Sequence, residues 1–144
     1  GILQADLGMN RILHNTQWVI GAHAHMQILV GLSATLFAAL YAIFPMVTKR
    51  EVKSEFLSNV HFWCQMVGGI GMSVSMGFAG LNGMLRRTLY MGDPTFLNEM
   101  YFAAFFGTIL LIGYAVMMFN LINSIGIRSL IGLFVPIKLF TQNT

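Results

Sequence analysis

The chain is divided into three long apolar runs that are separated by short polar segments. The runs extend over Gln17–Phe44, Phe56–Leu85 and Thr95–Ile122, and the first two contain no Asp, Glu, Lys or Arg. A helix needs about 20 mostly apolar residues to cross the hydrocarbon core of a bilayer. Each run is long enough, so the pattern predicts an all-α integral membrane protein, a helical bundle of three transmembrane helices forming one membrane unit.

The segments outside these runs are predicted to lie at the membrane surfaces. Residues 1–16 mix polar and apolar positions and are expected to form a loop on the outer side, and the charged residues 48–55 form the loop after the first span. Pro45 is expected to end the first helix or to kink it. Residues 126–144 are interrupted by charges and Pro, and are expected to form a surface-lying or subunit-contacting tail.

Composition agrees with a membrane protein and excludes other classes. The 144 residues are 56% hydrophobic and only 9% charged, with a mean hydropathy of +0.71, whereas soluble proteins carry about 25% charged residues. The net charge of +3 is scattered without a basic stripe, so membrane lipid and not nucleic acid is the expected partner.

The lone Cys64 excludes an intrachain disulfide and is expected to be a packing residue. The start at Gly1, without a signal-peptide pattern, suggests a split gene product or a fragment of a longer chain.

The orientation in the membrane is predicted from the basic residues. With three spans, one side of the membrane carries five of them and the other side carries three. The positive-inside rule places the richer side in the cytoplasm. The five are Lys49, Arg50, Lys53, Arg128 and Lys138, and the three are Arg11, Arg86 and Arg87.

Two histidines one residue apart, His23 and His25, lie within the first apolar run. An ionisable residue inside a membrane is by default a candidate for function. Positions i and i+2 of an α-helix are about 200° apart, so the two rings cannot share one metal but can each bind a separate one. A neutral imidazole is a good axial ligand for haem iron, and the small Ala22 and Ala24 would let flat macrocycles approach. The other interpretation is that each ring only forms a hydrogen bond to a neighbouring helix.

Four other residues carry candidate chemistry. Arg86 and Arg87 end the second run, where they either reach lipid headgroups or present their guanidinium donors to carboxylates such as haem propionates. His14 is either a surface histidine near a helix start or a ligand. His61 is expected to be a hydrogen-bonded interface residue, because nothing near it in the sequence completes a metal site.

Four short motifs stand out in the sequence: His14-Asn15-Thr16, Trp18-Val19, His23-Ala24-His25 and Gly80-Leu81-Asn82-Gly83-Met84-Leu85-Arg86-Arg87. Taken together, they resemble the C-terminal part of the catalytic subunit I of the haem-copper oxygen reductases, the terminal cytochrome c and quinol oxidases. The resemblance covers residues 1–125 and corresponds to the last three of the twelve membrane helices of that subunit.

The resemblance implies a role for each candidate residue. His23 matches the axial ligand of the high-spin haem, which faces a copper ion at the catalytic centre, and His25 matches a ligand of the low-spin haem. Arg86 and Arg87 match the pair that holds the haem propionates, and His14 matches a residue near a magnesium site. The implied cofactors are therefore two haems, a copper ion bound by the remainder of subunit I, and magnesium as a further candidate.

The function implied by the resemblance is reduction of O₂ to water with proton translocation in a respiratory chain. The chain would be active only with the remainder of subunit I, together with subunit II and other oxidase subunits. The electron donor would be cytochrome c, a blue-copper protein or quinol. The membrane would be a prokaryotic plasma membrane, with the mitochondrial inner membrane as the less favoured alternative. The alternatives are a nitric oxide reductase of the same superfamily and a non-catalytic haem-binding or structural membrane protein.

The sequence departs from the family pattern at three places. Asn15 stands where many members have Asp, which weakens a magnesium site, and Ala24 stands where an aromatic residue is frequent. Nine positions separate His14 from His23, where the pattern has eight. Either the additional residue is accommodated by a π-bulge near residues 20–22, or His14 is not the matching residue.

Overall fold

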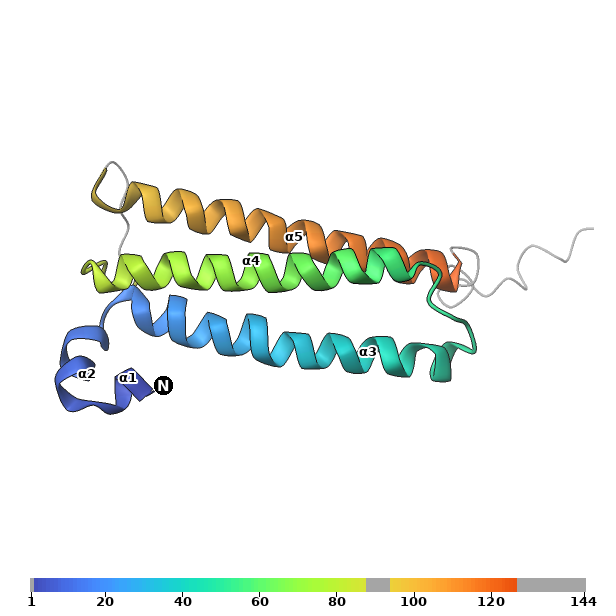
Figure 1. Ribbon diagram of the computed structural model, residues 1–144, viewed down its shortest axis with the longest axis horizontal. Helices are drawn as coiled ribbons and strands as arrows, with labels where there is room; N and C mark the ends of the chain where they lie inside the picture. The colour runs from blue at the N-terminus through green and yellow to red at the C-terminus, as the bar shows by residue number, and fades with distance from the viewer. Residues whose placement is uncertain (1, 88–93, 127–144) are drawn as a thin grey trace, which may run out of the picture.

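The computed structural model describes residues 2–87 and 94–126 as three long helices that lie side by side, preceded by two short ones (Figure 1). Three helical segments, Val19–Thr48, Glu55–Leu81 and Pro94–Ile125, are long and apolar enough to cross a membrane. The predicted all-α membrane bundle is thereby confirmed. In chain order the elements are α1 (Ile2–Ala5), α2 (Leu7–Leu13), the π-helix η1 (Val19–Leu32), α3 (Ser33–Thr48), α4 (Glu55–Leu81), the 3₁₀-helix η2 (Pro94–Phe96) and α5 (Leu97–Ile125).

The N-terminal segment differs from the expected loop, because it contains α1 and α2. Asp6 is the N-cap of α2, and its Oδ1 accepts a hydrogen bond of 2.8 Å from the backbone N–H of Met9. Such a cap satisfies a backbone donor that the first turn of a helix leaves unpaired. Leu13 at the end of α2 is the buried residue of this helix.

The first long helix extends past Pro45, which lies inside α3 and does not end it. The end comes at Lys49, which has a φ of 56° and donates its backbone N–H to the carbonyl of Pro45 at 3.0 Å. A residue in the left-handed conformation is a common way to end a helix. The predicted tail after Gly126, with Arg128 and Lys138, lies outside the described residues.

Helix α4 is the central element of the bundle, with α5 on one side and the η1–α3 helix on the other (Figure 1). Glycines allow it to approach α5 closely. A Cβ on Gly68 would lie 2.7 Å from the backbone nitrogen of Leu110, and one on Gly113 would lie 2.7 Å from the Cβ of Cys64. Small residues at such contacts are how membrane helices gain packing energy without a hydrophobic driving force, and Cys64 is a packing residue here as expected.

The ends of α4 and α5 near residues 48–54 are joined by polar contacts. Asn120 is completely buried, and its Nδ2 donates to the carbonyl of Ser54 at 2.8 Å and to Oγ of Ser58 at 3.1 Å. Arg50 donates to the backbone carbonyl of Ile125, the last residue of α5. A cation at a helix C-terminus is favourable because it opposes the negative end of the helix dipole, so this contact fixes α5 against the loop.

Candidate functional site

The two candidate ligands His23 and His25 lie in η1, a π-helix of 14 residues. A π-helix has i→i+5 hydrogen bonds and usually appears as a single-turn bulge, frequently at functional sites. The additional residue expected near residues 20–22 falls inside this segment, but the wider winding extends to Leu32. Two residues correspond to about half a turn of either winding, so the rings of His23 and His25 leave η1 on different sides.

The ring of His25 is oriented by its own helix. Its Nδ1 lies 2.5 Å from the backbone carbonyl oxygen of Ile20, five residues earlier. Since a carbonyl only accepts, Nδ1 carries the proton, and Nε2 keeps the lone pair that a metal would bind. Histidines that bind metals almost always donate their other nitrogen to a carbonyl or carboxylate in this way. The side chains of both His23 and His25 are half-buried.

The N-terminal half of η1 is seated tightly on α4. A Cβ on Gly80 would collide with the backbone of Trp18, and one on Gly77 would lie 2.8 Å from the Cβ of Ala22. Ala22, which was expected to leave room for a macrocycle, therefore contacts α4. These glycines fix the depth at which the helix that carries both histidines sits against its neighbour.

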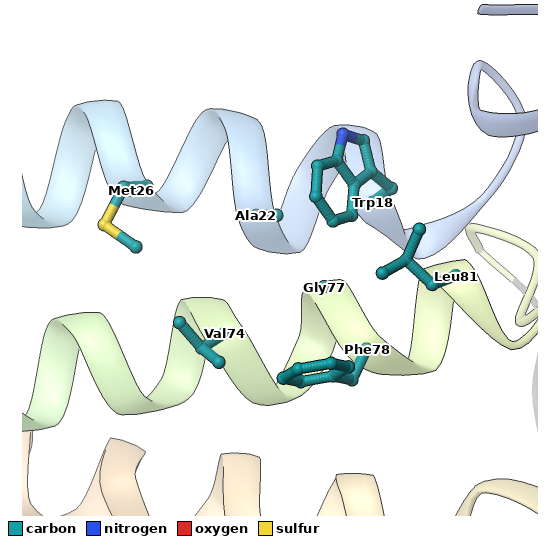
Figure 2. Close-up of a pocket in the computed structure, with 7 residues that line it drawn as sticks. All are labelled: Trp18, Ala22, Met26, Val74, Gly77, Phe78 and Leu81. Carbon is teal, nitrogen blue, oxygen red and sulfur yellow. The ribbon is translucent and has the colours of Figure 1, made fainter. Parts of the chain in front are cut away.

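A cavity of about 360 Å³ lies between η1 and α4 beside this contact (Figure 2). All of its lining side chains are apolar, apart from the indole N–H of Trp18. The cavity suits the hydrocarbon part of a ligand, and neither histidine lines it. The lining residues are Trp18 directly before η1, Ala22 and Met26 from η1, and Val74, Gly77, Phe78 and Leu81 from α4.

The motif that contains His14 and the motif that contains the two arginines meet at one end of the bundle. Thr16 and Leu85 form an isolated antiparallel bridge. Arg86 donates its backbone N–H to the carbonyl of Asn15 at 3.1 Å, and its side-chain Nε to Oδ1 of Asn15 at 3.2 Å. The structure thus joins the segment before η1 to the segment after α4.

The residues at this end of the bundle differ in the exposure of their side chains and in backbone strain. Arg86 is half-buried, whereas Arg87 is exposed and has a φ of 61°. For a residue other than Gly, such a backbone conformation costs about 1–3 kcal/mol and is concentrated at functional sites. His14 is exposed, and its Nδ1 lies 3.2 Å from the carbonyls of Asn10 and Arg11.

A magnesium site is not complete within residues 2–87 and 94–126. No group of three or more His, Cys, Asp or Glu side chains comes together in this part of the chain. The Oδ1 of Asn15, beside His14, is already an acceptor for Arg86. The described residues therefore do not by themselves fit magnesium.

His61 lies away from these residues, inside the bundle. Its side chain is 2% exposed, its Nδ1 lies 3.3 Å from the hydroxyl of Tyr41, and the ring of Phe37 packs edge-on against it at 4.9 Å. The expectation of a hydrogen-bonded interface residue is confirmed.

Gln65 is not among the candidate residues predicted from the sequence, although it contacts η1, the helix that carries His23 and His25. Gln65 is 2% exposed on α4, and its Nε2 donates to the backbone carbonyl of Leu29 in η1. The available signal was an amide in the middle of a run without charges, because a polar group inside a membrane needs a partner.

Comparison with known proteins identifies relatives of the chain. The family described as cytochrome C and quinol oxidase polypeptide I matches residues 1–115. Cytochrome c oxidase polypeptide 1 of Halobacterium salinarum is 38% identical over 87 residues, which cover 60% of this chain and 14% of the relative. Alternative cytochrome c oxidase subunit 1 of Bradyrhizobium diazoefficiens is 30% identical over 130 residues, 87% of this chain and 22% of the relative. Cytochrome c oxidase subunit 1 of Thermus thermophilus is 26% identical over 129 residues, 85% and 23% respectively. The chain spans less than a quarter of the length of these relatives.

Proposed function

The chain belongs to the cytochrome c and quinol oxidase polypeptide I family, and from this membership we propose that it supplies the axial ligands of two haems in a respiratory terminal oxidase. The family match and the three apolar helices establish that the chain is part of a haem-copper oxidase subunit in a membrane. Haem and copper are the general cofactors of that family. The observation that carries the proposal is the hydrogen bond between Nδ1 of His25 and the carbonyl of Ile20.

His25 is the proposed ligand of the low-spin haem. The contact with Ile20 holds the imidazole in one orientation and makes Nε2 the basic nitrogen. A hydrogen bond from the other ring nitrogen also increases the basicity of the ligand. These are properties that a permanent axial ligand requires, and a ring that only joined two helices would not need them.

His23 is the proposed ligand of the high-spin haem, and therefore the residue at the catalytic centre. It projects from the same π-helix as His25, on a different side, so one rigid element would hold two macrocycles apart at a constant separation. The seating of Trp18 and Ala22 against α4 supports this role, since it limits movement of the helix.

Arg86 and Arg87 are the proposed partners of the haem propionates. Asn15 holds the guanidinium of Arg86 through Nε, which leaves its two terminal nitrogens to face carboxylates. Guanidinium groups bind carboxylates with two parallel hydrogen bonds. The two arginines would thereby compensate negative charge at the edge of the bundle.

When bound, the haems and copper would supply electron transfer and the reduction of O₂ to water, which in this proposal is coupled to proton translocation. The residues of this chain would hold and orient these groups, while copper ligands come from the remainder of subunit I. Subunit II and other oxidase subunits are the proposed partners, and cytochrome c, a blue-copper protein or quinol is the donor. The organisms of the three relatives support a prokaryotic plasma membrane.

The relatives also bear on the alternatives. All three carry names of cytochrome c oxidases, which supports oxygen over nitric oxide as the substrate. A non-catalytic membrane protein would not need the constrained tautomer of His25.

The proposed function is tested by spectroscopy of the native membrane complex that contains this chain. A reduced-minus-oxidised spectrum, recorded with and without carbon monoxide, should show one low-spin haem and one CO-reactive high-spin haem. Metal analysis should find copper together with the two haem irons. A complex without a CO-reactive haem would overturn the proposal, and a complex with haems and non-haem iron in place of copper would favour the nitric oxide reductase.

A further inference from the structure

We propose that Gln65 is a positioning residue, which maintains the π-winding of η1 and thereby sets the orientation of the haem ligand His25. This inference rests on the proposed function, because it takes His25 to be a ligand. It concerns the side-chain amide of Gln65 on α4, which reaches across to the backbone of η1.

The contact is made where the π-helix passes into the α-helix α3. The backbone N–H of Ser33 donates to the carbonyls of Ile28 and Val30, and not to the carbonyl of Leu29, which lies between them in the sequence. Gln65 donates its Nε2 to this carbonyl of Leu29. The hydroxyl of Ser33 donates to Ile28 at 2.7 Å, so side chains supply two donors to the carbonyls at the junction.

The surroundings of Gln65 favour this contact. The side chain is 2% exposed, and no water competes for the donor in a membrane interior, where each unsatisfied backbone group costs several kcal/mol. Gly69, one turn further along α4, allows the helices to approach, because a Cβ there would lie 2.9 Å from Cγ2 of Val30. The amide therefore reaches Leu29 across a close helix contact.

The π-helix is thus held near both ends by α4. Near its N-terminal end, Trp18 and Ala22 pack against Gly80 and Gly77 of α4. Near its C-terminal end, the carbonyl of Leu29 accepts the hydrogen bond from Gln65. A change from π to α winding between these points would alter the number of residues per turn. The side chain of His25 would then rotate about the helix axis relative to α4. This rotation would change the spectroscopic signals of the low-spin haem.

The test uses the complete oxidase with Gln65→Met, which keeps the length of the side chain and removes the donor. Gln65→Glu is the conservative variant, since a buried carboxyl is neutral and retains one O–H donor. Ser75→Ala is the control on the same helix, because its hydroxyl donates only to Gly71 within α4. The readouts are the electron paramagnetic resonance signal, the visible α-band and the midpoint potential of the low-spin haem.

Gln65→Met should shift all three signals and lower turnover about tenfold, as expected for a residue that orients a metal ligand. Gln65→Glu should restore the native signals, and Ser75→Ala should retain them. A merely structural role would lower the amount of assembled complex but leave the signals of the assembled fraction unchanged, and that result overturns the inference.

A second measurement decides the case if Gln65→Met does not assemble. A cryo-EM structure of the wild-type complex should place the Gln65 amide within hydrogen-bond distance of the Leu29 carbonyl. An α-wound segment 19–32, or an amide directed elsewhere, would overturn the inference. A wild-type complex without two haems would instead contradict the proposed function.

Discussion

Nε of Arg86 donates a hydrogen bond to Oδ1 of Asn15 at 3.2 Å, and the two residues lie 71 positions apart in the chain. The backbone N–H of Arg86 also donates to the carbonyl of Asn15. The arginine thereby connects the segment before the π-helix to the segment after α4. The charge that faces the guanidinium at this contact depends on whether residue 15 is an amide or a carboxylate.

Asn15→Asp should lower the midpoint potentials of both haems in the complete oxidase. The carboxylate would pair with Arg86 and reduce the positive charge available to the propionates, which favours oxidised haem. Asn10→Asp introduces the same charge at an exposed position of α2 and is the matched control. Redox titration of both variants measures the effect, and equal shifts in the two would mean that the charge acts without the Arg86 contact.

Replacement of both Arg86 and Arg87 by Ala should lower the haem potentials further. Two positive charges are lost at the proposed propionate site, and the oxidised haems gain stability from the uncompensated carboxylates. Arg11→Ala, in the exposed last turn of α2, removes a charge from the predicted outer side without touching the site. Potentials that stay at the wild-type values in the double variant would contradict the role of the arginines.

His25→Ala should remove the low-spin haem signal and reduce turnover by more than about a hundredfold, because electrons no longer reach the catalytic centre. His23→Ala should instead remove the CO-reactive haem and leave the low-spin signal. Each variant is the control of the other, and difference spectra with carbon monoxide measure both. A normal low-spin spectrum in His25→Ala would contradict the assignment.

The long helices could be predicted from the sequence because each apolar run is longer than a bilayer requires. The short helices α1 and α2 were missed, since polar residues interrupt their pattern, although Asp6 was a recognisable cap. Pro45 lies inside α3 and does not end the helix, which continues to Thr48, because a proline near the C-terminus of a helix disturbs only the turn before it.

The site could be predicted only in part. Spacing against the family pattern indicated either an additional residue between His14 and His23, accommodated by a π-bulge, or a His14 that does not match the pattern. The extent of that winding depends on Gln65 and on the glycines of α4, which contact η1 from distant positions. Such contacts between helices leave no periodic signal in the sequence.

The close contact of Gly80 with Trp18 leads to a prediction about stability. Gly80→Ala should destabilise the bundle by about 1–3 kcal/mol, because its Cβ would collide with the backbone of Trp18, and a backbone cannot move aside as a side chain can. Gly31→Ala is the matched control in the π-helix, where the nearest atom to a new Cβ, the carbonyl oxygen of Met26, is 4.0 Å away. That substitution should be neutral or stabilising by about 0.5–1 kcal/mol, since Ala restricts the unfolded chain more than Gly does. Thermal unfolding of the detergent-solubilised complex measures the stability of both variants.

The same contact bears on the haem site, because Gly80 packs against the start of the helix that carries His23 and His25. The low-spin haem signal of Gly80→Ala should be lost at a lower temperature than in the wild type, whereas Gly31→Ala should keep the signal to the wild-type temperature. Equal stability of the two variants would mean that the Gly80 contact does not hold the site helix in place.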